Sequence, residues 1–187
     1  MADSKLTKRA LASALRELMK KEPFDKIQVT HICRQCKMNR KSFYYHFKDK
    51  YDLLNWIFDT ETSSFFRDFS GPESLEQHVK LILDICNYFY ENREFYYNAF
   101  KIQGQNSFSE HFWEYIRSFI KLRLVYLIGD EANDEFALDF FTDAIACAIE
   151  RWMSKKDCMQ PDELVPRLVN IVLRSANAVH QELKQSE

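Results

Sequence analysis

Two short helical patterns, separated by a tight break, lie close together near the start of the chain. The first covers about residues 29–36 and the second about residues 40–46, with the break at Lys37 and Met38. Small or apolar residues recur through this stretch where two helices would pack against a third. They are Ile32, Cys33, Cys36, Met38, Phe43 and Phe47. The stretch therefore predicts a helix-turn-helix, a motif whose second helix enters the major groove of DNA.

The third helix of such a motif is predicted immediately upstream, over residues 4–21. Apolar side chains from Leu6 to Met19 recur three and four residues apart, which is the spacing of one helical face. Ser4 is the expected N-cap, and the helix is expected to end before Pro23. Three basic residues fall off the apolar stripe and are expected to approach phosphates: Lys8, Arg9 and Arg16.

Charge is distributed unevenly along the chain. Residues 1–55 hold 13 Lys and Arg against 6 Asp and Glu, a net charge of +7. Residues 56–187 hold 13 basic and 22 acidic residues, a net charge of −9. A basic N-terminal segment on an acidic body fits a head that faces phosphates and a body that stays away from them.

The remainder of the chain is predicted to be entirely helical, because it has few turn-forming residues and no sustained strand alternation. The chain contains only 3 Gly and 4 Pro in 187 residues. One continuous helix of about 20 residues is expected from Asp49 to Phe69. Further helices are expected at about 73–91, 93–103, 107–128, 134–155 and 162–184. The fold class is thus all-α with about nine helices, divided into a helix-turn-helix DNA-binding domain over 1–48 and a helical regulatory and dimerisation domain over 49–187.

The last two helices carry more apolar surface than one core-facing stripe requires. Pairing of this surface with a second copy would bury the surplus as a four-helix bundle. The residues expected at such an interface are Phe140, Ala144, Ala148, Trp152, Leu168, Ile171, Val172 and Ser175. The alternative is that the two helices complete the core of a single protomer.

The second helix of the predicted motif offers side chains suited to reading DNA. Arg40 and Lys41 can donate to guanine edges or phosphates, and Ser42 and Tyr44 can reach phosphate oxygens. The adjacent Tyr45 and His46 can reach base edges, and Lys50 is expected at a phosphate. A solvated polar helix with aromatic core residues is the alternative. Three consecutive aromatic or imidazole side chains cannot all face inward from one short helix, which favours DNA contact.

These residues carry a resemblance to a known family. The run SFYYHFKDKYDLL, preceded by ICRQCKMNR and by PFDKIQVT, resembles the TetR family of transcriptional regulators over roughly residues 5–55. The resemblance implies an all-helical homodimer with a variable, ligand-binding C-terminal domain. It also implies DNA-facing positions at Thr30, Asn39, Arg40, Lys41, Ser42, Tyr44, Tyr45, His46 and Lys50. The run NRKSFYYHFKDKYDLLNWIF looks most like the subgroup of dihydroxyacetone kinase regulators.

Two positions depart from the pattern of that family. Lys37 stands where the family usually has Gly, at a turn position that tends to need a left-handed backbone. A non-Gly residue in that conformation costs about 1–2 kcal/mol. Lys41 also stands where Gly is common, so a long cation is expected to alter base preference or to add a phosphate contact.

Aromatic side chains of the C-terminal helices are expected to line a ligand cavity, with ordinary core packing as the alternative for each of them. They are Phe66, Phe89, Tyr96, Phe100, Phe112, Trp113, Tyr115 and Phe141.

Other classes of function find no support in the residues. The chain has no Gly-rich phosphate loop, no G-x-S-x-G and no H-E-x-x-H, so an enzyme is not expected. Cys33 and Cys36 lack a second Cys or His pair at finger spacing, so neither a metal site nor another cofactor is expected. No apolar run reaches the roughly 18 residues of a membrane helix, and no secretory signal pattern opens the sequence. A cytoplasmic protein with reduced thiols is expected.

The sequence therefore predicts a homodimeric regulator of transcription that binds double-stranded operator DNA and is most often a repressor in this family. A small molecule bound in the C-terminal domain would tilt the helix that begins near Asp49 and so change the spacing of the two recognition helices. The alternative keeps the DNA-binding head and makes the body a docking platform for a protein co-regulator, with activation as the outcome.

Overall fold

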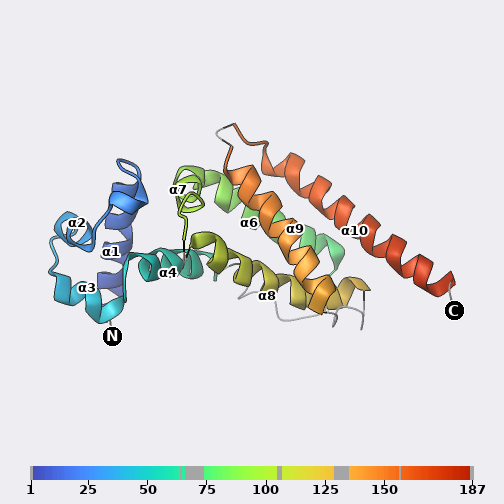
Figure 1. Ribbon diagram of the computed structural model, residues 1–187, viewed down its shortest axis with the longest axis horizontal. Helices are drawn as coiled ribbons and strands as arrows, with labels where there is room; N and C mark the ends of the chain where they lie inside the picture. The colour runs from blue at the N-terminus through green and yellow to red at the C-terminus, as the bar shows by residue number, and fades with distance from the viewer. Residues whose placement is uncertain are drawn as a thin grey trace. The chain divides into compact units, whose positions relative to one another are not determined.

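The computed structural model describes residues 2–63, 65, 74–104, 107–128, 135–155 and 157–185, and all regular elements among them are helices. The predicted all-α fold is confirmed, with nine α-helices in the part described (Figure 1). They are α1 (Ala2–Met19), α2 (Val29–Gln35), α3 (Arg40–His46), α4 (Lys50–Thr62), α6 (Leu75–Glu91), α7 (Arg93–Ala99), α8 (Phe108–Ile128), α9 (Glu135–Met153) and α10 (Pro161–Gln185), together with a 3-10 turn at Phe24–Lys26.

Contacts between residues divide the chain into two compact units. The N-terminal unit comprises Met1–Ser70 and Asn92–Phe108, and the C-terminal unit comprises Gly71–Glu91 and Ser109–Glu187. Helices α4 and α7 therefore belong by packing to the same unit as α1, α2 and α3. The boundary predicted between residues 48 and 49 does not coincide with this division into packing units, and as a boundary between functions it stays a prediction.

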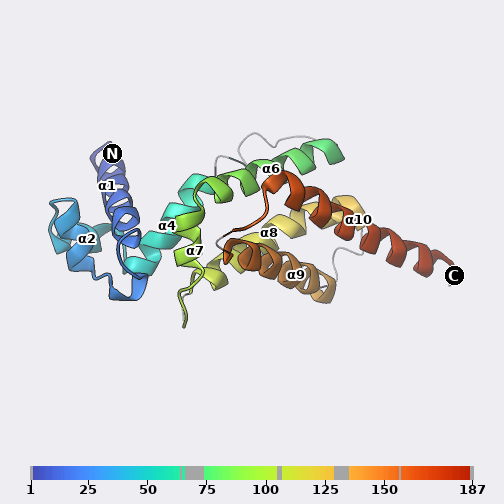
Figure 2. The same ribbon diagram turned by 90° about the horizontal axis from the view of Figure 1, so that it is seen from above.

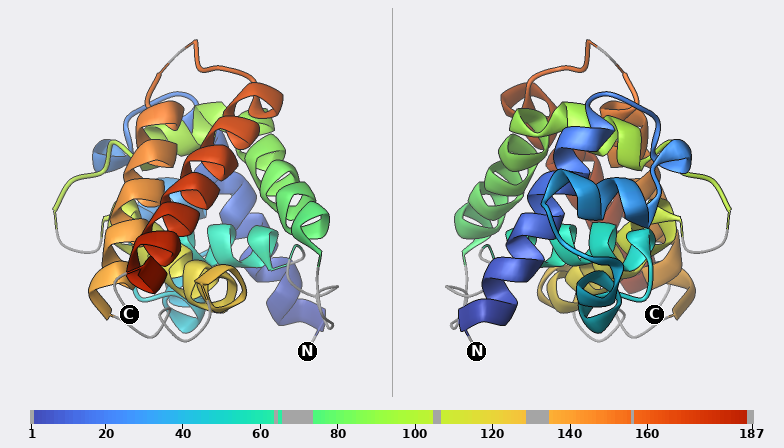
Figure 3. Two further views of the ribbon diagram at one scale, coloured as in Figure 1. Left: turned by 90° about the vertical axis from the view of Figure 1, so that its right-hand side faces the viewer. Right: turned by 90° about the vertical axis from the view of Figure 1, so that its left-hand side faces the viewer.

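The N-terminal unit is built on α1, which packs against α2, α4 and α7, while α2 packs against α3 (Figure 3, right). Its core side chains are fully excluded from solvent at Leu11, Leu15, Ile32 and Phe43. An isolated helix of seven residues is unstable in water, so α2 and α3 depend on this packing rather than on their own propensity.

Caps fix where the short helices begin. Asn39 was predicted to cap α3, and its Oδ1 accepts a hydrogen bond of 2.8 Å from the Ser42 amide. Asp49 caps α4 in the same way, with Oδ1 accepting from the amides of Tyr51 and Asp52 at 2.8 and 2.9 Å. The prediction for α1 was wrong, because that helix begins at Ala2 and Ser4 lies inside it.

Helix α4 is shorter than the sequence predicted. It ends at Thr62 after 13 residues, with Ser63 as its C-cap, instead of continuing for about 20 residues. The hydroxyls of Thr62 and Ser63 donate to the carbonyls of Phe58 and Thr60 at 2.8 and 2.9 Å. Short hydroxyl side chains that bond to the backbone in this way compete with helix continuation. Phe66 and Phe69, which the predicted helix included, lie outside the described residues.

In the C-terminal unit, α10 packs along α6, and Figure 3 (left) shows α10 lying between α9 and α6. Figure 2 shows the same helices from above, with α9 on the side of α10 away from α6 and α8 passing behind α10. Trp152 of α9 is buried, lies parallel to Tyr90 of α6 at 6.4 Å between ring centroids, and donates from Nε1 to the Met159 carbonyl at 2.8 Å. Trp152 was predicted at a dimer interface, but the structure uses it to hold α9 to α6 and to the segment before α10.

The turn between α2 and α3 has the conformation that the sequence predicted. Lys37 has φ of +55°, which places it in the left-handed region, and it is the only non-Gly residue with positive φ in the part of the chain described. The Lys37 side chain is exposed, so its only evident constraint is this backbone strain.

Replacing Lys37 by Gly is expected to stabilise the fold. Relief of about 1–2 kcal/mol of left-handed strain is partly offset by about 0.5–1 kcal/mol from the greater freedom of Gly in the unfolded chain. A net gain of up to about 1 kcal/mol in the free energy of unfolding is expected by urea denaturation. Lys37→Ala is the matched control, because it removes the lysine and keeps the strain. A gain of equal size in both variants would show that the lysine side chain, and not φ, is the source.

Candidate functional site

The outward face of α3 consists of polar and aromatic side chains, while its inward face is fixed in the core. Phe43 is fully buried and Phe47, the C-cap, is 3% exposed. Tyr44 and Tyr45 are 50% and 82% exposed, although aromatic side chains of this size are usually covered. Arg40 and Lys41 are exposed on the first turn. The helix therefore presents two cations and two phenol rings to solvent.

Contacts between these side chains hold part of the exposed face in place. Arg40 donates to the Tyr44 hydroxyl at 3.4 Å, and its guanidinium carbon lies 5.7 Å from the centre of that ring. The hydrogen bond to Tyr44 raises the pKa of Arg40, so this side chain carries a full positive charge under all ordinary conditions. His46 packs edge-on against Tyr45 at 4.9 Å and is half-buried. Arg40 and Tyr44 thus form one pre-arranged pair of donors.

Three other predicted DNA-facing residues are engaged at helix starts. Asn39 and Ser42 bond to each other, since the Asn39 Oδ1 accepts from both the Ser42 amide and its hydroxyl. Thr30, in the first turn of α2, donates to the Gln28 side-chain oxygen at 3.3 Å. Asn39 retains its amide hydrogens and Thr30 its acceptor lone pairs, so both keep capacity for a further bond.

Lys50 has a role inside the N-terminal unit that the sequence did not predict. Its ammonium donates to the carbonyls of Phe24 and Ile27 at 2.7 and 2.9 Å, with the Asp25 carbonyl at 3.3 Å, and lies 4.4 Å from the centre of the Phe24 ring. Burial lowers its pKa. The three N–H donors of a lysine are matched by three carbonyls here. Lys50 therefore holds the 3-10 turn before α2 to the start of α4.

Lys8 and Arg16, two basic residues of α1, also pack against aromatic rings of the N-terminal unit. The Lys8 ammonium lies 5.5 Å from the centre of the Phe47 ring and 5.6 Å from that of Trp56. Arg16 forms an ion pair with Glu61 of α4 and stacks 4.0 Å from the centre of the Phe95 ring of α7. Arg16 was expected to approach a phosphate, but in the structure its side chain joins α1 to α4 and α7.

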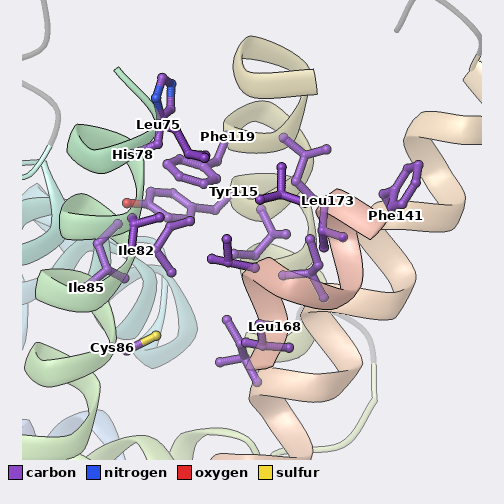
Figure 4. Close-up of a pocket in the computed structure, with 17 residues that line it drawn as sticks. Leu75, His78, Ile82, Ile85, Cys86, Tyr115, Phe119, Phe141, Leu168 and Leu173 are labelled. Atoms are coloured by element: carbon purple, nitrogen blue, oxygen red, sulfur yellow. The ribbon is translucent and has the colours of Figure 1, made fainter. Parts of the chain in front are cut away.

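The C-terminal unit contains an apolar cavity of about 130 Å³ between α6, α8, α9 and α10 (Figure 4). Its walls include Ile82 and Cys86 of α6, Tyr115 of α8, Phe141 of α9 and Leu168 of α10. Burial raises the pKa of the Cys86 thiol to about 12, so this group stays neutral at physiological pH.

Only part of the predicted cavity lining is found there. Tyr115 and Phe141 line the cavity. Phe89 and Phe112 are buried against each other, with ring centroids 5.8 Å apart, and are not among the lining residues described. The sequence reasoning followed ring size, whereas the walls are mostly aliphatic side chains. The sequence feature that could have identified these walls is the spacing of Leu75, Val79, Ile82 and Cys86, which places them on one face of α6.

The other predicted lining residues lie elsewhere. Tyr96 and Phe100 are buried in the N-terminal unit, where each packs against Phe108 at 5.8 and 5.0 Å between ring centroids. Trp113 donates from Nε1 to Asp143 at 2.7 Å on the surface of the C-terminal unit. Phe66 lies outside the described residues.

The residues predicted at a dimer interface fall into two groups. Phe140, Ala144, Ile171 and Ser175 are exposed, and Phe136, which was not predicted, extends the same face of α9 with 78% of its surface exposed. Ala148 is half-buried, and Leu168 and Val172 line the cavity. Trp152 is buried, so the large apolar side chains left exposed on these two helices are Phe136 and Phe140 of α9 and Ile171 of α10, which we refer to together as the exposed apolar strip.

His31 and Cys36, whose side chains could bind a metal, form hydrogen bonds with the backbone around α2 instead. His31 Nδ1 accepts from the Gln28 amide at 3.4 Å, and the Cys36 thiol donates to the Ile32 carbonyl at 3.3 Å. No group of three or more potential metal ligands is found among these residues. None of their helices combines the length and apolarity needed to cross a membrane.

Comparison with known proteins decides the family. Residues 11–57 match the family described as bacterial regulatory proteins of the tetR family, and residues 76–174 match a transcriptional regulator C-terminal region of that family. The chain belongs to the TetR family of transcriptional regulators. It is accordingly a DNA-binding regulator of transcription and not an enzyme, as the sequence predicted.

Individual relatives agree with this assignment. The chain is 31% identical over 113 residues to the HTH-type dhaKLM operon transcriptional activator DhaS of Lactococcus lactis subsp. lactis (strain IL1403), an alignment that covers 60% of this chain and 57% of the relative. The fold is similar to that of a dihydroxyacetone kinase operon activator DhaS, with a TM-score of 0.65 and 22% identity over 92% of this chain and 97% of that one. It is also similar to a TetR transcriptional regulator of Streptococcus agalactiae 2603V, with a TM-score of 0.70 and 17% identity over 91% and 96% of the two chains.

Replacing Lys50 by Met is expected to destabilise this TetR-family protein without removing a phosphate contact. The change keeps the aliphatic stem and leaves the three carbonyls without their donor, which should lower the free energy of unfolding by about 1–3 kcal/mol. The slope of log affinity against log salt for random-sequence duplex DNA should not change. The neighbouring, exposed Lys48→Met is the control for loss of a charge. A salt slope smaller by about 0.9 in Lys50→Met would instead place its ammonium on a phosphate.

Proposed function

We propose that the protein is a homodimer that reads a specific operator through the exposed face of α3. The single observation that supports this most strongly is the orientation of α3, in which Phe43 is buried and Arg40, Lys41, Tyr44 and Tyr45 are exposed. The surrounding segment is also basic, with a net charge of +7 over residues 1–55. Positive charge supplies affinity for any duplex, and contacts to base edges supply the choice of sequence.

Within α3 the side chains are proposed to divide this work. Arg40 and Lys41 donate to guanine edges or phosphates, and Tyr44, paired with Arg40, donates to a phosphate oxygen. Tyr45 is the most exposed of the aromatic residues of α3 and is proposed to contact bases together with His46. Asn39, Ser42 and Thr30 are proposed to bond to the backbone of the duplex at the helix starts. Lys50 is left out of this set because of its internal bonds.

Loss of the Arg40 side chain is expected to weaken operator binding at least tenfold, because a charged donor and the partner of Tyr44 are removed together. Tyr44→Phe removes only the hydroxyl and should have a smaller effect in the same direction. Both are measured by fluorescence anisotropy on an operator selected from fragments of the source genome. Arg151→Ala, at an exposed arginine of the C-terminal unit, is the control. Equal affinity of Arg40→Ala and wild type would remove α3 as the reading element.

Dimerisation is proposed to use the exposed apolar strip on α9 and α10. Phe136, Phe140 and Ile171 are 78%, 60% and 63% exposed. A contiguous exposed apolar patch is typical of an interface, and these three side chains are proposed to form one. In a dimer that reads two half-sites one turn of DNA apart, the two α3 helices must lie about 34–36 Å apart.

The change Phe140→Asp is expected to convert the dimer to a monomer, because it places a charge in the centre of the strip. Sedimentation velocity should show a dissociation constant at least tenfold higher than that of wild type. Leu6→Asp is the matched control, since Leu6 is 64% exposed on α1 of the N-terminal unit. A wild type that sediments as a monomer at micromolar concentration, or a Phe140→Asp variant that stays dimeric, would contradict this interface.

Control of DNA affinity is proposed to come from a small molecule in the cavity of the C-terminal unit. Helix α4 supplies none of the described lining residues, so the tilt of α4 suggested by the sequence would have to be produced through other helices. Helix α6 lines the cavity and is followed, after Asn92 alone, by α7, which Arg16 holds to α1 and α4. Helix α8 lines the cavity and begins at Phe108, whose ring lies 5.4 Å from that of Phe58 in α4. Binding in the cavity would act on α4 through these two helices.

A second candidate is an activator controlled by a protein co-regulator. The name of the Lactococcus lactis relative, a transcriptional activator of the dhaKLM operon, favours activation over the repression that the sequence predicted. A reporter gene placed behind the selected operator distinguishes activation from repression. Expression that rises when the protein is supplied indicates activation, and expression that falls indicates repression.

A further inference from the structure

We infer that the molecule held in the cavity of the C-terminal unit is compact, uncharged and essentially hydrocarbon in character, about the size of a single six-membered ring. This inference rests on the proposed control by a small ligand and names its chemical class. It excludes trioses, other polyols and phosphate esters, even though relatives of the chain are named for a dihydroxyacetone kinase operon.

The volume sets the size of the ligand. A cavity of about 130 Å³ is smaller than most drug-binding pockets, which span about 300–1,000 Å³. It is close to the apolar cavities of about 150 Å³ that stay dry and accept benzene or xenon. A molecule of one ring or a short alkyl chain therefore fits, and a larger one requires the walls to move.

The walls set the polarity of the ligand. Seventeen described residues line the cavity, and no Asp, Glu, Lys or Arg is among them. Only His78, Cys86 and Tyr115 carry a polar side-chain atom. A carboxylate or phosphate would lose its water shell here without gaining a charged partner or several donors, which makes its binding strongly unfavourable.

The positions of these three polar groups further reduce the number of hydrogen bonds that they can form with a ligand. Figure 4 shows the Tyr115 hydroxyl pointing toward α6, so this residue presents its ring to the cavity. His78 lies 2.9 Å from the Ser74 carbonyl through Nδ1, which therefore carries the hydrogen, and stands beside the partly exposed Leu75. Cys86 is a thiol, which is a weak donor, and its pKa of about 12 keeps it neutral. The cavity thus offers few hydrogen bonds to a polyol, and each hydroxyl left without a partner would lower affinity roughly tenfold or more.

Toluene is the probe for a direct test on the full-length protein with labelled Ile, Leu and Val methyl groups. Saturable shifts are expected for methyls of Ile82, Ile149 and Leu168, which line the cavity, and a dose-dependent rise in the thermal midpoint should accompany them. Dihydroxyacetone and glycerol 3-phosphate at the same concentrations should give neither. Saturable binding of either polar compound at these methyls, or absence of any shift with toluene, would overturn the inferred ligand class.

Two nearby residues on α10 give a matched pair of variants. Val172 lines the cavity, while Asn170 is exposed and lies outside both the cavity lining and the proposed dimer strip. Val172→Phe should fill the cavity and weaken toluene binding at least tenfold, and Asn170→Phe should leave it unchanged. Equal effects of the two substitutions, or wild-type affinity in Val172→Phe, would place the probe outside the cavity.

A third variant covers the possibility that Val172→Phe fails to fold. Ile149, a buried lining residue of α9, can be shortened to Ala to enlarge the cavity. Ile149→Ala should then bind naphthalene at least tenfold more tightly than wild type does, and equal affinity for naphthalene would count against the assigned site.

Operator affinity measured with and without toluene separates this inference from the proposed control. Saturable toluene binding without any change in operator affinity would support the ligand class and remove ligand control through this cavity. A change in operator affinity caused by a triose phosphate bound at the same methyls would support ligand control and overturn the ligand class.

Discussion

Burial of Phe43 is the interaction on which the DNA-reading surface depends. With seven residues, α3 is too short to be stable alone, so its position is set by how it attaches to the rest of the N-terminal unit. Phe43 is fully buried and packs edge-on to Tyr44 at 5.4 Å and near Phe47 at 5.9 Å. Because one side chain is fixed in the core, the orientation of the helix about its own axis is fixed as well. Arg40, Lys41 and Tyr44 face solvent as a consequence of that orientation.

Arg16 and Phe108 hold the other helices of the N-terminal unit together, as Phe43 holds α3. Arg16 is a single guanidinium shared by Glu61 of α4, by Asn92 and by the ring of Phe95. Phe108 is the first residue of α8, and it packs with Phe58, Tyr96 and Phe100 in one aromatic cluster. Each of these two residues therefore joins α4 to a segment that continues into a cavity-lining helix. Helix α8 has its first residue in the N-terminal unit and its remaining residues in the C-terminal unit, while α6 lies wholly in the C-terminal unit and is joined to α7 through Asn92.

The sequence predicted the all-α fold, the cap at Asn39 and the left-handed turn at Lys37 because each depends on near neighbours. Helical spacing, a capping side chain and the local backbone are properties of a few consecutive residues. Lys50 shows where that reasoning stops, since its carbonyl partners lie 23–26 residues away in the chain. The cavity lining could not be predicted for a similar reason. Whether Phe112 fills the core or faces a cavity depends on how four helices pack, and an apolar stripe has the same sequence pattern in both cases.

Helix α10 links the two proposals of ligand binding in the cavity and dimerisation through α9 and α10. Successive residues on a helix are about 100° apart, so Leu168 and Val172 share one face while Ile171 and Ser175 share another. Leu168 and Val172 line the cavity, whereas Ile171 and Ser175 are exposed on the side of the proposed dimer strip. A molecule that enters the cavity pushes on the inner face of the helix whose outer face would contact the partner. Close-packed helices move as units, so a shift of α10 would change the geometry of the dimer contact as well as the cavity. In the proposed dimer, that geometry would set the separation of the α3 helices, and the proposed control would then need no contact between the ligand and the DNA-binding unit.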